Sequence, residues 1–386
     1  MLKSIWMHAW DLEGIEPDEL IAFLKDCGLN ACNLAFSYHG GRMLLPRHRR
    51  HKVYEQDLSA VYFPANESLY RNCSLQPHVA PQARLLRPFV DAAREAGFGV
   101  NAWAALCHND RLGGGAPECC IENVFGDRYS YALCPANPEA RGYIKALCAD
   151  IAAFDGVARL DLEAFSFLGF DHQSPHDKRG VPLTPPVTWL LSICFCADCR
   201  RRLSEAAEEV ERKTRGYLNN YFEKFDEARP GELRAELEKA LGRSALEALL
   251  EMRRQVITSL LDEVRAAVGE AHINLRLATL PLFIGGKTAL DWSQLAGRVD
   301  SATNTFLGAS SEQMAAELER LPRPEQRPVP VYGGFSFHHP DCLSESDVRR
   351  RFALLRQTRL DGVLFYCYGM AAVRHFKWLK KVLKEE

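Results

Sequence analysis

Residues 157–165 read Val-Ala-Arg-Leu-Asp-Leu-Glu-Ala-Phe, so that Arg159, Asp161 and Glu163 alternate with apolar residues. Side chains two positions apart in a β-strand lie on the same face, which puts the three charges on one face and the leucines on the other. In a barrel of parallel strands the outer face is covered by apolar helices, so the charged face must point inward. The stretch therefore predicts a barrel strand with a polar, functional interior.

Similar short runs recur along the whole chain. We expect eight strands, at Ser4 to Asp11, Asn30 to Tyr38, Gly99 to Cys107, Val157 to Phe165, Ile273 to Leu280, Ser301 to Leu307, Val329 to Phe337 and Gly362 to Tyr368. Apolar residues at helical spacing follow several of them, at Pro17 to Cys27, Ala80 to Ala96, Pro138 to Phe154, Ser311 to Leu321 and Ser344 to Thr358. Eight alternating units predict an α/β protein, a closed (β/α)8 TIM barrel. An open doubly wound sheet is the alternative, but no Gly-x-Gly-x-x-Gly turn follows the first strand.

Two connections are unusually long. The segment Gly40 to Val79 after the second strand is a polar loop, and Ser204 to Val268, between the fourth and fifth strands, has the pattern of charged amphipathic helices broken at Pro230-Gly231. Both leave from the C-terminal ends of strands, so both should lie over the barrel mouth. We expect one barrel domain over residues 1–386 with a helical insertion at residues 200–270.

The composition narrows the class of protein. Hydrophobic residues make up 47% of the 386 residues and charged residues 25%, which suits a globular protein with a large core. A net charge of −2 without long basic runs argues against nucleic acid as a partner. No signal-peptide pattern and no long uncharged apolar stretch is present, so we expect no membrane association. The thirteen scattered cysteines suggest reduced thiols and a cytoplasmic location.

The same alternation selects inward-facing polar residues on the other strands. They are His8 on the first strand, Asn33 and Ser37 on the second, Asn101 and Trp103 on the third, Arg276 on the fifth, Asn304 on the sixth, and Tyr366 and Tyr368 on the eighth. On the seventh strand, Tyr332 and Ser336 share one face, and Phe335 and Phe337 share the other. The sequence leaves open which of these two faces points inward. A purely structural ion cluster is the alternative, but a polar residue from nearly every strand favours a functional site.

Two carboxylates among aromatic and hydrogen-bonding side chains are typical of a sugar site. We interpret Glu163 as the general acid/base, and Asp161, held ionised by Arg159 and Arg276, as the nucleophile or the stabiliser of the transition state. Asp341 is the alternative second carboxylate. Further expected substrate contacts are Trp6, Trp10, Tyr38, Arg42, His172, Tyr332 and His338. Arg42, Arg47, His48 and Tyr54 belong to the loop that is expected to cover the pocket.

Two resemblances support this interpretation. Asp155-Gly156-Val157 leading to Asp161-Leu162-Glu163 resembles the strand-four signature of family 18 chitinases, which implies that the terminal Glu is the acid and that the preceding Asp orients an acetamido group. The chain differs by one extra residue and by Ala158 or Arg159 where a further acid is expected. From Trp6 to Tyr368 the sequence resembles bacterial glycoside-hydrolase-like barrel proteins of uncharacterised function, a resemblance carried by residues 133–138, 160–167 and 194–199. That resemblance implies a sugar-hydrolase scaffold.

The cysteines and histidines raise the question of metals. Cys194, Cys196 and Cys199, with Cys119-Cys120 upstream, could form a structural zinc site or could be small hydrophobic residues that attach the insertion to the barrel; we favour the second interpretation. His338, His339 and Asp341, or His172 and His176, could bind a catalytic metal with Glu163. We assign no metal ligand and expect no cofactor.

The sequence therefore predicts a glycoside hydrolase that acts on a small or soluble carbohydrate. A non-catalytic carbohydrate-binding barrel and a metal-dependent sugar isomerase or aldolase are the alternatives. Whether the chain forms a homo-oligomer stays open.

Overall fold

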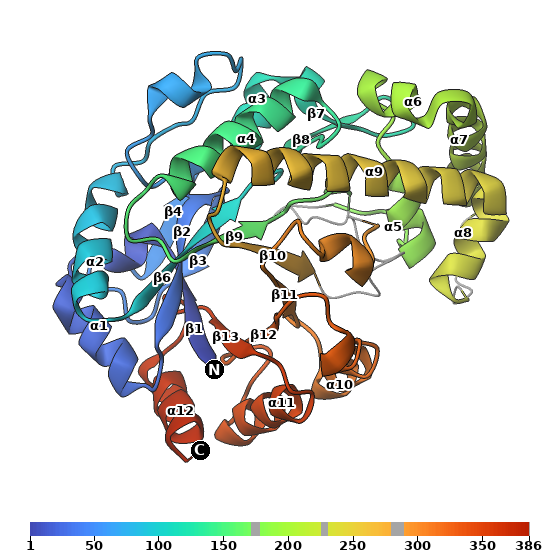
Figure 1. The fold of residues 1–386 in the computed structure, drawn as a ribbon. Coiled ribbons are helices and arrows are strands. Elements are labelled where there is room, and N and C mark those ends of the chain that lie inside the picture. Colours follow the sequence, from blue (N-terminus) through green and yellow to red (C-terminus); the bar gives the residue numbers. More distant parts are fainter. Residues whose placement is uncertain (171–177, 225–230, 279–288, 386) are drawn as a thin grey trace.

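Eight parallel strands close into a barrel. The computed structural model describes residues 1–170, 178–224, 231–278 and 289–385. The barrel strands are β1 (Leu2–Met7), β2 (Ala31–Tyr38), β6 (Gly99–Ala105), β9 (Arg159–Glu163), β10 (Ile273–Ala278), β11 (Ser301–Thr305), β12 (Val331–Ser336) and β13 (Gly362–Tyr366). Each pairs in parallel with its neighbours, and β1 pairs with both β2 and β13, which closes the ring (Figure 1). The predicted (β/α)8 TIM barrel is confirmed, and each of its eight barrel strands overlaps its predicted range.

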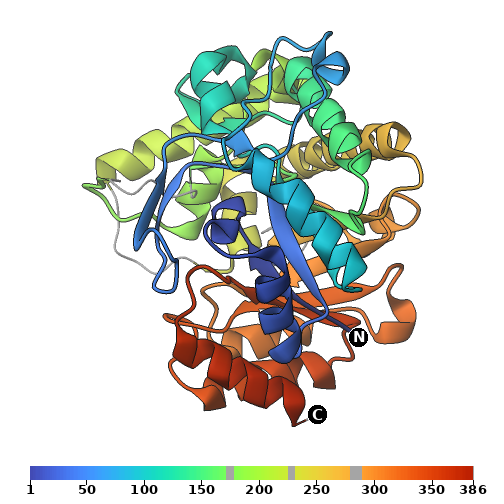
Figure 2. The ribbon, with the colours of Figure 1, turned by 90° about the vertical axis from the view of Figure 1, so that its left-hand side faces the viewer.

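Helices surround the strands on the outside. They are α1 (Pro17–Asp26), α2 (Ala83–Glu95), α4 (Pro138–Ala152), α9 (Arg243–Val268), α10 (Ser311–Leu318), α11 (Glu345–Gln357) and α12 (Val373–Lys384). Their starts follow from local sequence: Pro stands at the first turn of α1 and α4, and the Asn137 side chain caps α4. Ser344 and Asp347 form a capping box at α11. Figures 1 and 2 show this outer layer from two directions, with both termini at the same end of the molecule.

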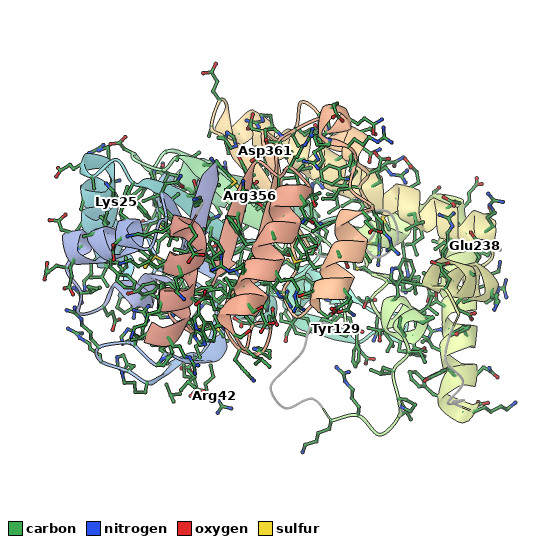
Figure 3. All side chains as sticks on the ribbon, turned by 90° about the horizontal axis from the view of Figure 1, so that it is seen from below. Lys25, Arg42, Tyr129, Glu238, Arg356 and Asp361 are labelled. Atoms are coloured by element: carbon green, nitrogen blue, oxygen red, sulfur yellow. The ribbon has the colours of Figure 1, made fainter. Side chains whose placement is uncertain are left out.

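The segment after β2 contains more regular structure than the expected loop. It forms an antiparallel hairpin of β3 (Gly41–Leu44) and β4 (Val53–Gln56), then β5 (Ala60–Val61), which pairs antiparallel with the end of β2, and the 3₁₀ helix η2 (Glu67–Tyr70). In Figure 3, Arg42 on this hairpin and Asp361, just before β13, lie at opposite ends of the molecule. The hairpin therefore stands at the C-terminal end of the barrel.

Two other connections carry additional elements. Between β6 and α4 lie α3 (Asp110–Gly115), the 3₁₀ helix η3 (Pro117–Cys119) and a hairpin of β7 (Cys120–Glu122) and β8 (Arg128–Leu133), which the sequence analysis did not anticipate. Between β9 and α9 lie α5 (Pro185–Leu191), α6 (Ala197–Leu203), the 3₁₀ helix η4 (Ser204–Ala206), α7 (Ala207–Lys224) and α8 (Leu233–Leu241). These helices gather to one side of the barrel, beyond β10 (Figure 1).

Three further 3₁₀ helices are η1 (Ala9–Leu12) after β1, η5 (Trp292–Leu295) before β11 and η6 (Pro324–Gln326) before β12. Because η1 begins at Ala9, the first strand is shorter than predicted, and Trp10 and Asp11 belong to a turn of helix above it. Among the helices in the described ranges, none combines the length and the apolar character needed to cross a membrane.

Contacts in the barrel interior show which side chains of β11 and β12 point inward. Ser301 and Thr303 donate hydrogen bonds to Asn274 inside the barrel, so Asn304 lies on the opposite, outward phase of β11. The expectation that Asn304 faces the site is wrong. The sequence Ser-Ala-Thr-Asn-Thr is polar in both phases, so alternation could not choose between them. On β12 the inward phase is that of Tyr332, because the Arg159 guanidinium lies 5.1 Å from the Tyr332 ring centre.

Candidate active site at the barrel mouth

Asp161 lies at the centre of a fully buried polar layer. Asn33 Nδ2 donates to its Oδ2 at 2.6 Å, Asn274 Nδ2 donates to its Oδ1 at 2.6 Å, and Trp6 Nε1 donates to Oδ2 at 3.3 Å. Asn101 supports this layer by donating to Asn33 Oδ1 at 3.0 Å. Both carboxylate oxygens are thus occupied by protein donors, and the side chain has no exposed surface.

Glu163 ends β9 one step nearer the barrel mouth. Its Oε2 accepts a hydrogen bond from Trp103 Nε1 and lies 2.9 Å from Arg276 Nη1 in an ion pair. The Glu163 side chain is 25% exposed, whereas that of Arg276 is only 7% exposed. Arg276 is held from behind by stacking on Trp6, with 4.7 Å between the guanidinium carbon and the ring centre. Glu163 is therefore an accessible carboxylate in a rigid setting.

The two acids of β9 differ in electrostatics. Burial raises the pKa of Asp161 above its usual value, and the repulsion of Glu163 acts in the same direction, while Arg276 and the Asn donors oppose the rise. Of the two arginines expected to keep Asp161 ionised, Arg276 is the one that lowers the pKa of Asp161 most. Arg159 stacks on Tyr332, and its Nε and Nη1 find no hydrogen-bond partner among the described residues. Arg276 is the arginine that acts on both acids.

Arg159 and Glu163 lie at different heights along the barrel axis, which explains why they have different partners. Arg159 is the first residue of β9 and Glu163 the last, and four steps of about 3.3 Å separate them by roughly 13 Å. Tyr332 is the second residue of β12 and lies at the same lower level as Arg159. Both face inward but stand near the N-terminal end of the barrel. The predicted substrate contacts of Arg159 and Tyr332 are therefore not compatible with a site at the mouth.

Aromatic side chains gather around Glu163. Trp103 lies 6.5 Å from Tyr366 and 4.8 Å from Tyr38, measured between ring centres, and the hydroxyl groups of Tyr38 and Tyr366 are hydrogen-bonded to each other. Tyr38 reaches this position because the pairing of β2 with β6 shifts between Ala35 and Ser37. Such a bulge redirects the following side chain. The negative charge of Glu163 contributes to raising the pKa of both tyrosines, after the larger effect of burial.

His8 and Trp10 continue the aromatic surface. Their rings stack with 4.4 Å between centres, and Trp10 also stacks on Tyr54 of the β3–β4 hairpin at 4.6 Å. His8 lies 5.2 Å from Trp103, and its Nε2 has no hydrogen-bond partner among the described residues. The loop after β2 thus contacts the site through Tyr54, while Arg42 of the same loop is exposed and points outward (Figure 3).

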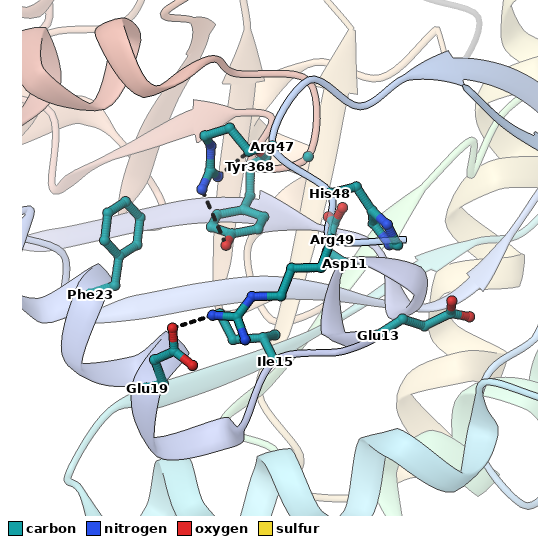
Figure 4. Close-up of a pocket in the computed structure, with 10 residues that line it drawn as sticks. Asp11, Glu13, Ile15, Glu19, Phe23, Arg47, His48, Arg49 and Tyr368 are labelled. Atoms are coloured by element: carbon teal, nitrogen blue, oxygen red, sulfur yellow. Dashed lines mark hydrogen bonds and ion pairs between the residues drawn. The ribbon is translucent and has the colours of Figure 1, made fainter. Parts of the chain in front are cut away.

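A cavity of about 170 Å³ opens beside η1 and α1 (Figure 4). It is lined by Asp11, Glu13, Ile15, Glu19, Phe23, Arg47, His48, Arg49, Tyr368 and Gly369. Arg47 stacks on Tyr368, with 4.3 Å to the ring centre, and donates to its backbone oxygen. Tyr368 therefore lines this cavity and packs against Phe23 of α1 and Phe376 of α12, away from the aromatic group around Glu163.

The remaining candidates either bind backbone groups or lie outside the described residues. His338 Nδ1 bonds the His339 oxygen at 2.8 Å, and its Nε2 accepts from Cys367 N at 3.2 Å, so both ring nitrogens bind backbone. Asp341 accepts from Gly308 N at 2.9 Å on the neighbouring loop. His172 and His176 lie outside the described residues. The side chains of His338 and Asp341 thus bind backbone groups of nearby segments.

The buried layer contains one further residue that was not among the predicted site residues, Asn274. Asn274 bonds Asp161, Ser301 and Thr303 and so connects three strands. It shares its phase with Arg276, two positions later on β10, so the alternation that selected Arg276 also indicates Asn274.

Two groups of side chains among the described residues bring three or more metal-ligating atoms within 4.8 Å of one another. One is His8, Asp11 and Cys367; the other is Cys134, Cys194, Cys196 and Cys199. The expected upstream partners, Cys119 and Cys120, are not part of the second group. Cys134, from the Leu133-Cys134-Pro135 segment, takes that place.

A comparison of the sequence with protein-family models gives no match, and neither does a comparison with curated protein sequences. Solved structures do match. The PgaB (BpsB) glycoside hydrolase domain from Bordetella bronchiseptica has a TM-score of 0.59 and 13% identity, with 99% of each chain covered. Alpha-L-fucosidase isoenzyme 2 from Paenibacillus thiaminolyticus has a TM-score of 0.60 and 10% identity, covering 100% of this chain and 49% of the fucosidase. The catalytic domain of beta-amylase from Paenibacillus polymyxa has a TM-score of 0.58 and 10% identity, covering 100% and 98%. The chain therefore has the fold of glycoside-hydrolase TIM barrels.

Proposed function

We propose that the protein hydrolyses glycosidic bonds and that Glu163 is the residue that transfers the proton. The observation that carries this proposal is a partly exposed carboxylate at the C-terminal end of β9, held by Trp103 and Arg276. In this fold, active sites form at the C-terminal ends of the strands. A carboxyl group there can protonate the leaving oxygen and then activate water.

The surroundings of Glu163 suit a sugar ring. Trp103, Tyr366 and Tyr38 offer aromatic faces and hydroxyl groups, and Arg276 offers a charged donor beside the acid. Aromatic faces cover the apolar C–H surface of a pyranose, while hydroxyl and guanidinium groups bind its oxygens. The His8 Nε2 is a further polar atom on this side of the barrel.

Asp161 has a different role in this proposal. It cannot contact a sugar while it is fully buried, so we assign it a positioning role in place of the nucleophile. Its carboxylate binds Trp6 Nε1, the Trp6 ring supports Arg276, and Arg276 pairs with Glu163. Asp161 therefore determines where Arg276 and Glu163 stand.

The test is the variant Glu163→Gln, assayed on a panel that includes aryl α-L-fucosides and aryl β-galactosides. Turnover of substrates with poor leaving groups should fall by about 10²–10⁴-fold, because no proton reaches the departing oxygen. Activated aryl glycosides should lose less, because their leaving group departs without a proton.

The matched control is Glu122→Gln, which changes another arginine-paired glutamate, in β7. It should leave turnover unchanged. Equal turnover by wild type and Glu163→Gln would contradict the proposal. Sugar binding by the wild type without any hydrolysis would identify a carbohydrate-binding barrel instead.

A further inference from the structure

Four cysteine sulfurs meet at one point away from Glu163. Cys134 Sγ lies 3.6 Å from Cys199 Sγ, 3.7 Å from Cys194 Sγ and 3.7 Å from Cys196 Sγ. All four sulfurs lie within 4.8 Å of one another, and each residue is at most 4% exposed. The four residues come from two chain segments that lie about 60 residues apart.

The separations match a tetrahedron of sulfurs around a metal. With a Zn–S bond of about 2.3 Å, the edges of a regular tetrahedron measure about 3.8 Å. The three sulfur distances from Cys134 are close to that value and close to one another. They are far too long for disulfides, and all thirteen cysteines are free.

Packing of thiols as small core residues is the alternative to a metal site. Other buried cysteines, such as Cys32 on β2 and Cys148 on α4, show how thiols serve as small core residues. Within the described ranges, no other group of metal-ligating side chains contains more than one cysteine. Apolar packing alone gives no reason for four thiols to converge.

We propose that Cys134, Cys194, Cys196 and Cys199 bind one Zn²⁺ ion in a closed structural site. Four thiolates fill the tetrahedral shell, so no position is left for a water or a substrate. The ion would join the end of the β7–β8 hairpin to the start of α6. Phe195 N already bonds Glu122 O at 2.7 Å between these two segments. Zinc would thus fasten the helices after β9 to the connection between β6 and α4.

The first experiment measures the metal content of protein purified without chelators or metal-affinity columns. We expect one zinc per chain by elemental analysis. Titration of the native protein with a mercurial should release that zinc as four thiols react. Replacement by Co²⁺ should give the absorption bands of tetrahedral cobalt–thiolate. Native protein that holds no metal, or that holds iron in place of zinc, would overturn the assignment.

The second experiment compares cysteine variants. Cys199→Ser and Cys134→Ser should lose the bound zinc, whereas Cys148→Ser should keep it, because Cys148 is an equally buried thiol outside the cluster. If either cluster variant fails to fold, the mercurial titration and cobalt spectrum of the wild type decide the question. Zinc retained by both cluster variants would contradict the proposal. The result is independent of glycosidase activity.

Discussion

Asp161 and Glu163 stand two residues apart on β9 and yet have different physical surroundings. Asp161 receives three N–H donors and has no solvent-exposed surface, while Glu163 receives one donor, one ion pair and partial contact with solvent. A buried carboxylate is tolerated only when its oxygens are hydrogen-bonded. The buried acid is therefore suited to hold neighbours in place, and the exposed acid to exchange protons.

The variant Asp161→Asn tests this division. The amide puts an N–H group against the donors of Asn33 and Trp6 or against that of Asn274, whichever way it is turned. We expect the free energy of unfolding to fall by about 1–3 kcal/mol. Urea denaturation measures the change. Asp155→Asn, at a surface acid paired with Arg94, should cost less than about 1 kcal/mol. An unchanged urea midpoint for Asp161→Asn would remove Asp161 from the supporting framework.

His338 at the end of β12 carries a pH-dependent part of the stability. Burial lowers the pKa of His338, and its Nε2 must stay unprotonated to accept from Cys367 N. Because the folded pKa lies below the usual value of about 6.5, the unfolded chain binds more protons as the pH falls below that value. Stability should therefore be lost on acidification through this range.

The expected result is that His338→Gln weakens this loss. As the pH is lowered from about 7.5 to about 5.5, the urea midpoint of the wild type should fall more than that of the variant, so that the two midpoints approach each other. Part of the slope should remain, since burial also lowers the pKa of His39, His272 and His375. An identical pH slope in both proteins would show that His338 does not titrate on unfolding.

At the scale of elements, Arg141 connects α4 to the long helix α9. Its Nη1 donates to Pro135 O and Val256 O, and its Nη2 to Ser259 Oγ and Glu263 Oε1. The Arg141 side chain is only 7% exposed. Since α9 also packs against α6, α7 and α8, this contact attaches the insertion to the barrel layer.

We predict that Arg141→Met lowers the free energy of unfolding by roughly 2–3 kcal/mol, because buried carbonyl oxygens lose their donors. Chemical denaturation measures the change. Lys145→Met is the matched control: Lys145 pairs with the same Glu263 but is 39% exposed, so it should cost less than about 1 kcal/mol. Similar losses of unfolding free energy in both variants would mean that the ion pair with Glu263, and not the buried hydrogen bonds, stabilises the contact between α4 and α9.

At the scale of the whole molecule, the barrel interior and the outer layer tolerate added volume differently. A Cβ on Gly334 would overlap the Trp6 ring, which Asp161 holds inside the barrel. A Cβ on the adjacent Gly333 would meet the side-chain ends of Leu355 and Leu360 in the outer layer. Flexible side-chain ends can move aside, whereas a hydrogen-bonded indole in a closed barrel cannot.

Gly334→Ala should therefore destabilise the protein by about 1–3 kcal/mol, and Gly333→Ala by clearly less. Thermal and urea unfolding of the two variants provide the comparison. The same chemical change on neighbouring residues of one strand makes this a direct test of which face is confined. A larger loss for Gly333→Ala would reverse the assigned phase of β12.

The sequence by itself determined the barrel and the inward face of most strands. Alternation at Arg159-Leu160-Asp161-Leu162-Glu163 was enough to place the charges inside, because a side-chain period of two leaves no other choice when one row is apolar. It was not enough at Ser301-Ala302-Thr303-Asn304-Thr305, where both rows are polar, nor at Tyr38, whose direction depends on a bulge in the pairing with β6.

Only the tertiary structure decided partnership. The order of residues along β9 already puts Glu163 nearer the mouth than Arg159, but only the structure shows that Arg159 lies against Tyr332 and that Arg276 pairs with Glu163. Likewise, Cys134 lies 60 residues from Cys194, and nothing local indicates that they meet. Contacts between distant segments depend on how strands pair and loops pack, because that long-range arrangement sets the distance between side chains that no local period connects.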